Sequence, residues 1–345
     1  MYTQFYGLSA RPFQLTPDAR FWFDSRTHKK AMAYLGYGLA QGEGFITITG
    51  EVGAGKSTLV AHLLATIDRE RLNAVSLVST QVEGDDMLRL AAQGLGIGTE
   101  GVAKAQLLDR IEARLSEEAG KGKRTLLIVD EAQNLPTSAL EELRMLSNFT
   151  RQGHALLQIF LLGQPEFRDR LANDDGLEQL RQRVIATHHL EAMEPGEIEA
   201  YLVHRLAVAG WEGRPGFEAG AFAAIHRQTG GIPRRVNQLA NRILLHGAVE
   251  RLDRIGADDV EAVAGDMAAD RPKAREERVL PLRSASASVA APAAQPEPVR
   301  DIAYERRIAA LEARLDEQEV ILRRVLTLLV EWVENSEPAY RSNAA

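Results

Sequence analysis

The chain has 345 residues, 45% of them hydrophobic and 26% charged, and its formal charge is −7. This length has room for about two domains with buried cores, and the acidic balance gives no global reason to expect nucleic-acid binding. The sequence holds no cysteine, which excludes disulfides, thiolate catalysis and cysteine zinc sites. No uncharged apolar run approaches the ~20 residues that a membrane span needs, and the first residues lack the pattern of a secretory signal. We therefore expect a cytoplasmic protein without a membrane span.

Short apolar runs alternate with helical patterns from residue 45 to about 193, which predicts an α/β fold with a parallel sheet. The expected strands are Phe45–Thr49, Asn73–Val78, Thr125–Val129, Leu156–Leu162 and Val184–Leu190. The expected helices lie near 56–69, 84–95, 104–118, 137–150 and 165–172. After residue 193 the pattern becomes purely helical until about Met267. We therefore expect a first domain over 1–193 and a small helical lid domain over 194–268.

The first expected strand is followed at once by a glycine-rich loop and a helix. From Gly50 to Ser57 the sequence fits G-x-x-x-x-G-K-[ST] in that setting. Glycine reaches positive φ without strain, so successive N–H groups can wrap a phosphate chain at the positive end of the helix. Lys56 is expected to reach the β- and γ-phosphates, and the Ser57 hydroxyl to bind Mg²⁺. The nucleotide-binding residues expected from this loop are Gly50, Glu51, Val52, Gly53, Ala54, Gly55, Lys56, Ser57 and Thr58.

Two acidic residues follow the buried strand in RTLLIVDEAQNL, residues 124–135. Ligands bind at the carboxyl ends of strands in open α/β sheets. Asp130 is therefore expected to support the Mg²⁺ shell, and Glu131 to act as general base on the attacking water. The alternative is a strand end followed by two solvated acids. The next strand ends before Gln164, which either hydrogen-bonds the γ-phosphate or the water, or belongs to an ordinary turn before Pro165.

Two further pairs of arginines are candidate functional residues. Arg181 and Arg183 precede the last expected strand in EQLRQRV, and either fits a charge clamp supplied to the ATP of a neighbouring subunit or a solvated helix end. Arg234 and Arg235 lie on the first turn of a helix, an electrostatically unfavourable place for cations. An anionic partner such as phosphate accounts for that placement, and a chance helix start is the alternative.

The composition changes beyond residue 268. Five prolines among alanines and serines predict a disordered linker over 269–300. Apolar residues then recur at alternating steps of four and three from Tyr304 to Trp332, which is a heptad pattern. We expect a coiled-coil helix over 301–334 and, with it, a homo-oligomer. The alternative is a single amphipathic helix that folds back on the core.

Several stretches together resemble one known family. They are FYGLSARPFQLTPDARFWF, the glycine-rich loop with its flanks, LLIVDEAQNL, ELRMLSNF, LLGQPEF, LEQLRQRV and GGIPRRVNQL. Over about Met1 to Met267 the chain resembles AAA+ ATPases of the general secretion pathway protein A type. Among these it is most similar to the secretion ATPases of XrtA/PEP-CTERM (exosortase) loci.

The resemblance implies roles for particular residues. It implies a Walker A motif at Gly50–Ser57, a Walker B motif at Asp130–Glu131 and a sensor 1 residue at Gln164. It also implies an arginine finger at Arg183 and a sensor 2 arginine at Arg234. The N-terminal signature, with its aromatic side chains Phe13, Phe21 and Trp22, is expected near the adenine or in the plain core.

The larger secretion relatives carry a transmembrane helix and a periplasmic peptidoglycan-binding part after the ATPase, whereas this sequence continues with the linker and the heptads. The resemblance therefore implies a cytosolic, Mg²⁺-dependent ATPase, with ATP and Mg²⁺ as cofactors. Its hydrolysis would drive conformational change in an export, exopolysaccharide or secretion assembly, whose proteins are the expected partners. Two other classes stay open: a DNA-binding regulatory ATPase of the transposition target-selection type, which the acidic charge disfavours, and a nucleotide-gated scaffold with little turnover.

Overall fold

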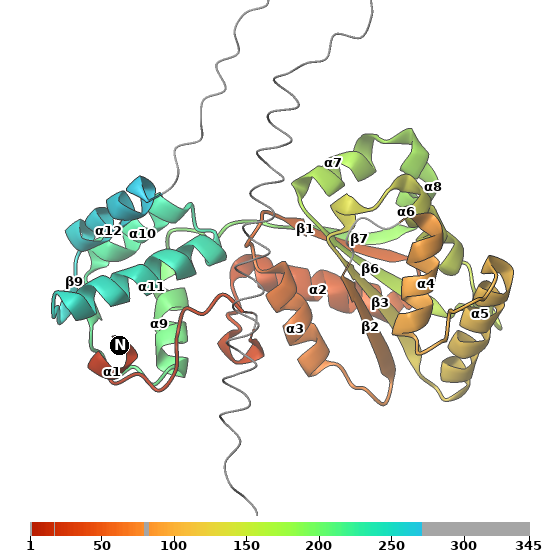
Figure 1. The fold of residues 1–345 in the computed structure, drawn as a ribbon, viewed down its shortest axis with the longest axis horizontal. Helices are drawn as coiled ribbons and strands as arrows, with labels where there is room; N and C mark the ends of the chain where they lie inside the picture. Colours follow the sequence, from red (N-terminus) through yellow and green to blue (C-terminus); the bar gives the residue numbers. More distant parts are fainter. Residues whose placement is uncertain (1, 17, 79–82, 271–345) are drawn as a thin grey trace, which may run out of the picture. The chain divides into compact units, whose positions relative to one another are not determined.

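A parallel five-stranded sheet forms the centre of the chain up to Leu190 (Figure 1). The computed structural model describes residues 2–16, 18–78 and 83–270. The strands of the sheet are β1 (Phe45–Gly50), β2 (Leu72–Val78), β3 (Arg124–Asp130), β6 (Leu157–Gly163) and β7 (Val184–Leu190). They lie in the order β2-β3-β6-β1-β7, and all neighbours are parallel. The expected parallel α/β fold is confirmed, and the carboxyl ends of β3, β6 and β1 meet at one edge.

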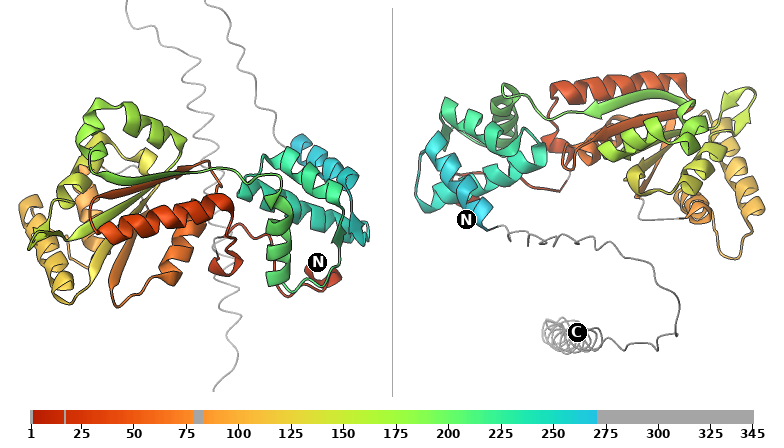
Figure 2. Two further views of the ribbon diagram at one scale, coloured as in Figure 1. Left: turned by 180° about the vertical axis from the view of Figure 1, so that it is seen from behind. Right: turned by 90° about the horizontal axis from the view of Figure 1, so that it is seen from above.

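Helices cover both faces of this sheet, which explains why its central strands β1, β3 and β6 are buried along nearly their whole length and not on one face only. One face is covered by α2 (Arg26–Gln41) and α3 (Lys56–Thr66), and Figure 2 shows α2 running along it. The other face is covered by α4 (Gly84–Gly94), α5 (Lys104–Gly120), α6 (Thr137–Leu146), α7 (Pro165–Asn173) and α8 (Glu178–Arg181). Two short 3₁₀ turns, η2 (Ala132–Asn134) and η3 (Asp175–Leu177), join these elements.

One local prediction in this part of the chain is wrong, and one helix was not predicted. The helix expected over 137–150 ends at Leu146, and a small antiparallel hairpin of β4 (Thr150–Arg151) and β5 (His154–Ala155) follows it. Both turn residues of this hairpin have positive φ, +54° at Gln152 and +81° at Gly153, as a two-residue turn with the twist of the strands requires. The unpredicted helix is α2.

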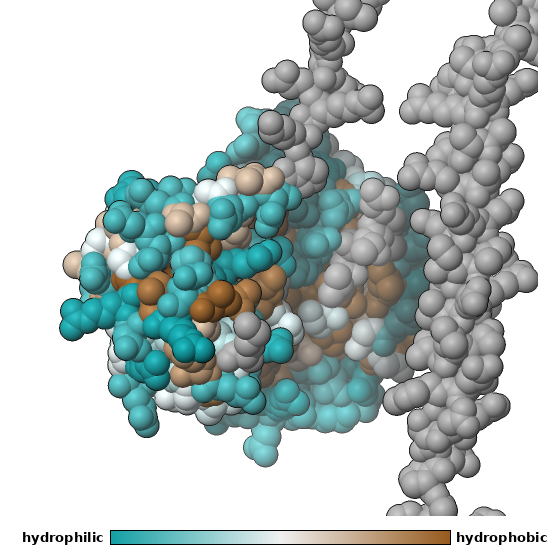
Figure 3. Space-filling view, turned by 60° about the vertical axis from the view of Figure 1, so that its left-hand side comes forward, coloured by the Kyte–Doolittle hydropathy of each residue, from teal (hydrophilic) through white to brown (hydrophobic). Residues whose placement is uncertain are grey.

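A second group of helices follows β7. Its elements are α9 (Glu197–Val208), α10 (Ala219–Thr229), α11 (Pro233–Val249), α12 (Ala257–Ala269) and a short parallel pair, β8 (Gly216–Phe217) with β9 (Arg254–Ile255). The expectation of a purely helical segment is therefore wrong at this pair. The visible face of this helical part in Figure 3 is mainly hydrophilic, with some apolar side chains gathered near its middle.

The N-terminal segment contains α1 (Tyr2–Phe5) and the 3₁₀ turn η1 (Ala19–Phe21). Its first part, residues 2–13, packs with the helical part, whereas Trp22, directly after η1, packs against the cluster that includes the central strands of the sheet. Tyr2, Tyr6, Leu8 and Phe13 are buried in the same cluster as the apolar side chains of α9 to α12. The Tyr2 hydroxyl also donates to Asn241 of α11 at 2.7 Å. The domain boundary at residue 193 stays a prediction, but residues 2–13 share their core with the helices on its far side.

The predicted linker (269–300) and coiled-coil helix (301–334) lie outside the described residues beyond Asp270, and both stay predictions. In the part that the structure describes, none of the helices combines the length and the apolar character that crossing a membrane requires.

Candidate functional site

The glycine-rich loop joins the end of β1 to the start of α3. Helix α3 begins at Lys56, and the preceding Gly53 and Gly55 have φ values of +89° and +102°, which glycine adopts without strain. The Lys56 ammonium donates to the carbonyl oxygen of Gly50 at 2.6 Å and to that of Glu51 at 3.1 Å. Burial lowers the pKa of Lys56, and nearby carboxylates oppose that effect. The loop therefore brings a cation and a helix N-terminus to one point, the combination that binds phosphate.

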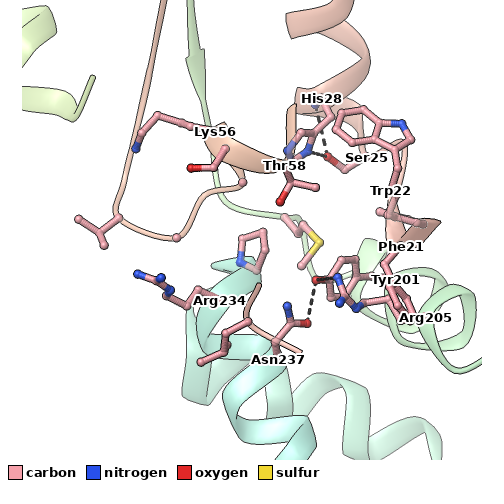
Figure 4. A pocket seen from close by; sticks show the side chains of 18 of the residues that line it. Phe21, Trp22, Ser25, His28, Lys56, Thr58, Tyr201, Arg205, Arg234 and Asn237 are labelled. Atoms are coloured by element: carbon pink, nitrogen blue, oxygen red, sulfur yellow. Dashed lines mark hydrogen bonds between the residues drawn. The ribbon is translucent and has the colours of Figure 1, made fainter. Parts of the chain in front are cut away.

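Two side chains from outside the loop press against its glycines. A Cβ atom at Gly53 would lie 2.4 Å from the Cβ of Arg234, and one at Gly55 would lie 2.6 Å from Nε2 of His28. The N–H of Arg234 donates to the carbonyl oxygen of Gly53 at 3.1 Å. The first turn of α11 thus contacts the loop directly, on the side opposite the start of α2 (Figure 4). At both positions a larger residue would push a neighbouring element away from the loop.

His28 is a buried part of this site that the sequence analysis missed. Its Nδ1 lies 2.7 Å from the hydroxyl of Ser25, the N-cap residue of α2. The edge of the ring packs against Trp22, whose own ring stacks on His62 of α3 at 4.1 Å. Burial lowers the pKa of His28 to about 4, although the backbone of Gly55 favours the cation. The ring is therefore neutral at physiological pH and fills the space behind the loop.

The two acids at the end of β3 face the same loop. The Ser57 hydroxyl lies 3.4 Å from Oδ2 of Asp130 and is oriented to donate to it. The N–H of Glu131 donates to Oδ1 of Asp130 at 2.8 Å, and Glu131 has a φ of +56°, a strained backbone conformation of the kind that gathers at functional sites. Its carboxylate accepts a hydrogen bond from the Asn134 amide at 3.1 Å. Side-chain oxygens of Ser57 and Asp130 thus lie together beside the phosphate-binding loop.

These oxygens fit Mg²⁺, which prefers hard oxygen ligands and is usually held by one or two carboxylates together with substrate phosphates. Among the described residues, no cluster of three or more histidine or acidic side chains could hold a metal by itself. A Mg²⁺ ion held by Ser57 and Asp130 would take its other ligands from water and from the phosphates of a bound nucleotide.

A pair of glutamines completes the edge of the sheet between β3 and β6. Gln164 follows β6 directly, and its N–H donates to Oε1 of Gln133 at 3.1 Å. Gln133 belongs to η2, immediately after the two acids. Both glutamines line the cavity above the loop. The structure therefore brings Gln164 to the expected place and adds Gln133, which the sequence analysis did not single out.

A cavity of about 250 Å³ lies over the loop and gathers most of the predicted residues. Its phosphate end is lined by Val52, Gly53, Gly55, Lys56, Ser57, Thr58, Asp130, Glu131, Gln164 and Arg234. Three predicted residues of the loop do not line it: Gly50 and Glu51 contribute carbonyl oxygens to Lys56, and Ala54 is buried beneath the loop.

The other end of the cavity is largely apolar. It is lined by Leu15, Phe21, Trp22, Phe23, Met193 and Tyr201, so two aromatic side chains of the N-terminal signature, Phe21 and Trp22, form part of its wall. Phe13 belongs to the core of the helical part instead. This apolar end of the cavity suits a flat nucleobase, because ligand-binding sites are mostly apolar and contain a few precisely placed polar groups.

One row of polar groups crosses this apolar end (Figure 4). The guanidinium of Arg205 is buried above the Phe21 ring at 4.8 Å and donates to the carbonyl oxygen of Pro12 at 2.7 Å. It also donates to the Tyr201 hydroxyl at 3.3 Å, and that hydroxyl donates to Oδ1 of Asn237 at 2.8 Å. The row ties the N-terminal segment to α9 and α11 at the wall of the cavity.

The structure does not bring Arg183 to this cavity. Arg183 precedes β7, whose first residue Val184 pairs with Phe45 at the start of β1, so it lies at the opposite edge of the sheet. The length of β1, roughly 20 Å, separates it from the loop of its own chain. Its guanidinium donates to the Ser147 hydroxyl at 3.0 Å. Arg181 donates to two carbonyl oxygens near the end of α7, a structural use of that side chain.

Comparisons with known proteins agree with this geometry. The family model described as "AAA domain" matches residues 39–171. General secretion pathway protein A of Aeromonas hydrophila is 36% identical over 271 residues, which cover 79% of this chain and 49% of that protein. The chain thus spans about half the length of this curated relative.

Among solved structures, the Aeropyrum pernix ORC2 protein matches with a TM-score of 0.56 and 16% identity, over 77% of this chain and 73% of that one. A chain of Drosophila ORC bound to DNA matches with a TM-score of 0.53 and 17% identity, over 77% and 65% respectively. At these identities the likeness is one of fold, and DNA binding does not follow from it. Taken with the loop, the acids and the cavity, the comparisons identify the described part of this chain as a AAA+ ATPase domain of the general secretion pathway protein A type.

Proposed function

We propose that this cavity binds Mg·ATP and hydrolyses it, and that the cycle drives conformational change in a secretion or export assembly. The observation that carries the proposal is the convergence of the glycine-rich loop, the two acids after β3 and Gln164 on one cavity. Its apolar end suits a base and its polar end suits a phosphate chain. ATP hydrolysis of this kind belongs in the cytoplasm, where ATP is supplied.

Each residue at the polar end has a chemical task in this proposal. Lys56 neutralises the β- and γ-phosphates, while Ser57 and Asp130 hold the cation. Mg²⁺ would supply positive charge that offsets the charge growing on the phosphoryl oxygens. Glu131 accepts the proton of the attacking water, because its carboxylate follows Asp130 at the same edge of the sheet. Gln164 donates from the neighbouring strand to the γ-phosphate or to the water.

The link from hydrolysis to movement runs through Arg234. Its backbone contacts Gly53, and its side chain lines the phosphate end of the cavity from the first turn of α11. If the guanidinium holds the γ-phosphate, losing that phosphate removes an ionic contact between the loop and the helical part. The helical part is then free to shift, since ligands change a conformational equilibrium only through contacts that differ between its states.

Arg183 fits this proposal only if a neighbouring subunit is present. Because it lies at the far edge of the sheet, it could act on phosphate only in another copy of the chain, as arginine fingers supplied in trans do. We therefore propose a homo-oligomer in which Arg183 completes the adjacent site. The similarity to general secretion pathway protein A supports partners from a secretion system, and the resemblance to exosortase-associated ATPases narrows this to an export or exopolysaccharide assembly.

Phosphate release by the wild-type chain and by Glu131→Gln, with and without Mg²⁺, tests the proposal. We expect turnover that EDTA abolishes, and a Glu131→Gln variant that binds ATP but turns over at least about a hundredfold more slowly, because the amide cannot accept the proton. Activity that survives EDTA, or a variant within about threefold of the wild type, would contradict these assignments. A wild-type chain that binds ATP without turnover would favour a nucleotide-gated scaffold.

A further inference from the structure

Gln133 lies at the phosphate end of the cavity without a role in the site described so far. It occupies the middle of the 3₁₀ turn that follows the two acids, and its side chain crosses from the β3 edge to the β6 edge. There its Oε1 accepts the backbone N–H of Gln164 at 3.1 Å. It lines the same cavity as Lys56, Ser57 and Glu131.

This hydrogen bond fixes which way the Gln133 amide faces. A backbone N–H only donates, so the atom that it contacts must be the amide oxygen and not the nitrogen. The Nε2 group, with two hydrogen-bond donors, is the half of the amide that this bond does not use. Gln133 lines the cavity, and the backbone of a neighbouring strand anchors the oxygen half of its amide.

A fixed donor is useful at this place for a physical reason. In phosphoryl transfer, negative charge spreads over the three equatorial oxygens of the γ-phosphoryl group, and catalysis consists mainly of positioning and electrostatic stabilisation. The surroundings of Lys56 are rich in carboxylates, from Asp130, Glu51, Glu131 and Glu166. A neutral amide adds a donor between these acids and the phosphate without needing a countercharge of its own.

We propose that Gln133 is a further catalytic residue, whose Nε2 donates to the γ-phosphoryl group of the bound nucleoside triphosphate while Oε1 anchors it to Gln164. This rests on the proposed function, since it requires the γ-phosphate to lie between Lys56 and Glu131. A nucleoside diphosphate lacks the group that Gln133 contacts. The residue therefore distinguishes ATP from ADP and also contributes to turnover.

Two substitutions in the full chain separate this role from a purely structural bridge. Gln133→Ala removes both the anchor and the donor, whereas Gln133→Glu keeps an oxygen that can accept the N–H of Gln164 and loses the donor. Gln106→Ala, at an exposed position of α5, is the matched control. The measurements are kcat and KM for ATP, affinities for ATP and ADP by isothermal titration, and the thermal unfolding midpoint.

We expect kcat to fall about a hundredfold in both Gln133 variants, the lower end of what one preorganised donor contributes. The affinity of Gln133→Ala for ATP should fall about fivefold, as for one lost neutral hydrogen bond, while its affinity for ADP stays close to that of the control. The unfolding midpoint of Gln133→Glu should also stay close to that of the control. A Gln133→Glu variant with wild-type kcat would overturn the proposal and leave a structural bridge. Equal loss of ATP and ADP affinity in Gln133→Ala would also overturn it. An inactive wild-type chain would instead contradict the proposed function.

Discussion

The stability of the ATPase domain should depend on pH through His28, the histidine packed behind the phosphate-binding loop. Burial lowers its folded-state pKa to about 4, against 6.5 for an ordinary histidine. The groups that face it pull in opposite directions: Asp24, Glu197 and the Gly55 backbone favour the cation, and His188 opposes it. Burial has the largest effect, so the ring of His28 stays neutral in the folded chain at pH values at which it is protonated in the unfolded chain.

The direction of this pH dependence of stability follows from the number of protons that each state binds. Between pH 6.5 and pH 4 the unfolded state binds a proton at His28 that the folded state does not, so stability is fully present above the unfolded pKa and is lost as the pH falls. With these two pKa values, linkage gives a loss of about 2 kcal/mol between pH 7.5 and pH 5. His188 and His189 also have pKa values lowered by burial and add losses of the same sign.

Urea unfolding of the wild type and of His28→Gln at the two pH values isolates this contribution. Glutamine does not titrate, so the variant should lose about 2 kcal/mol less than the wild type over the same interval, whatever its absolute stability. His154→Gln, in the exposed hairpin after α6, serves as the control for replacing a histidine by glutamine. Identical pH dependence in the wild type and His28→Gln would refute the argument that burial sets the pKa of this ring.

Three further outcomes are expected. Gly53→Ala should weaken ATP binding and lower the unfolding midpoint, because the new Cβ would clash with the Cβ of Arg234 at the start of α11 and because alanine in this backbone conformation costs about 1–2 kcal/mol. Gly196→Ala, which has open space around it, is the control, and equal effects of the two substitutions would refute the contact. Arg183→Ala should lower turnover but not ATP binding, and mixing it with Glu131→Gln subunits should restore activity at composite sites; no recovery at any ratio argues against action in trans. Removing the residues after 300 should reduce self-association while ATP binding survives, as measured by light scattering; equal masses would mean that the predicted coiled-coil helix has another use.

The sheet and the phosphate-binding loop were predictable because their signals are local. The central strands β1, β3 and β6 are buried on both faces along nearly their whole length, and β7 has the predicted bounds, Val184–Leu190. The loop is defined by four constrained positions within eight residues, and the acids of the second motif follow a strand directly. Such features depend only on neighbours in the sequence.

The residues that the sequence analysis missed act through contacts between distant segments. His28 matters because it touches Gly55, and Gln133 because it touches the backbone of Gln164; no spacing rule relates these pairs. The helix expected to reach residue 150 failed because its end is set by a hairpin whose turn lacks the usual Asn-Gly pair. Phe13 lies in the core of the helical part, which is the plain-core alternative that the sequence left open for it.

Titration of Mg·ATP into the wild-type chain and into Lys56→Ala tests the central claim most directly. Lys56 is the cation of the loop, its ammonium is held by the carbonyl oxygens of Gly50 and Glu51, and its removal leaves the cores of the sheet and of the helical part intact. We expect ATP binding by the wild type and no measurable binding by the variant, with thermal unfolding midpoints that agree. ATP affinity unchanged in Lys56→Ala would contradict the claim that this cavity is where the protein binds ATP.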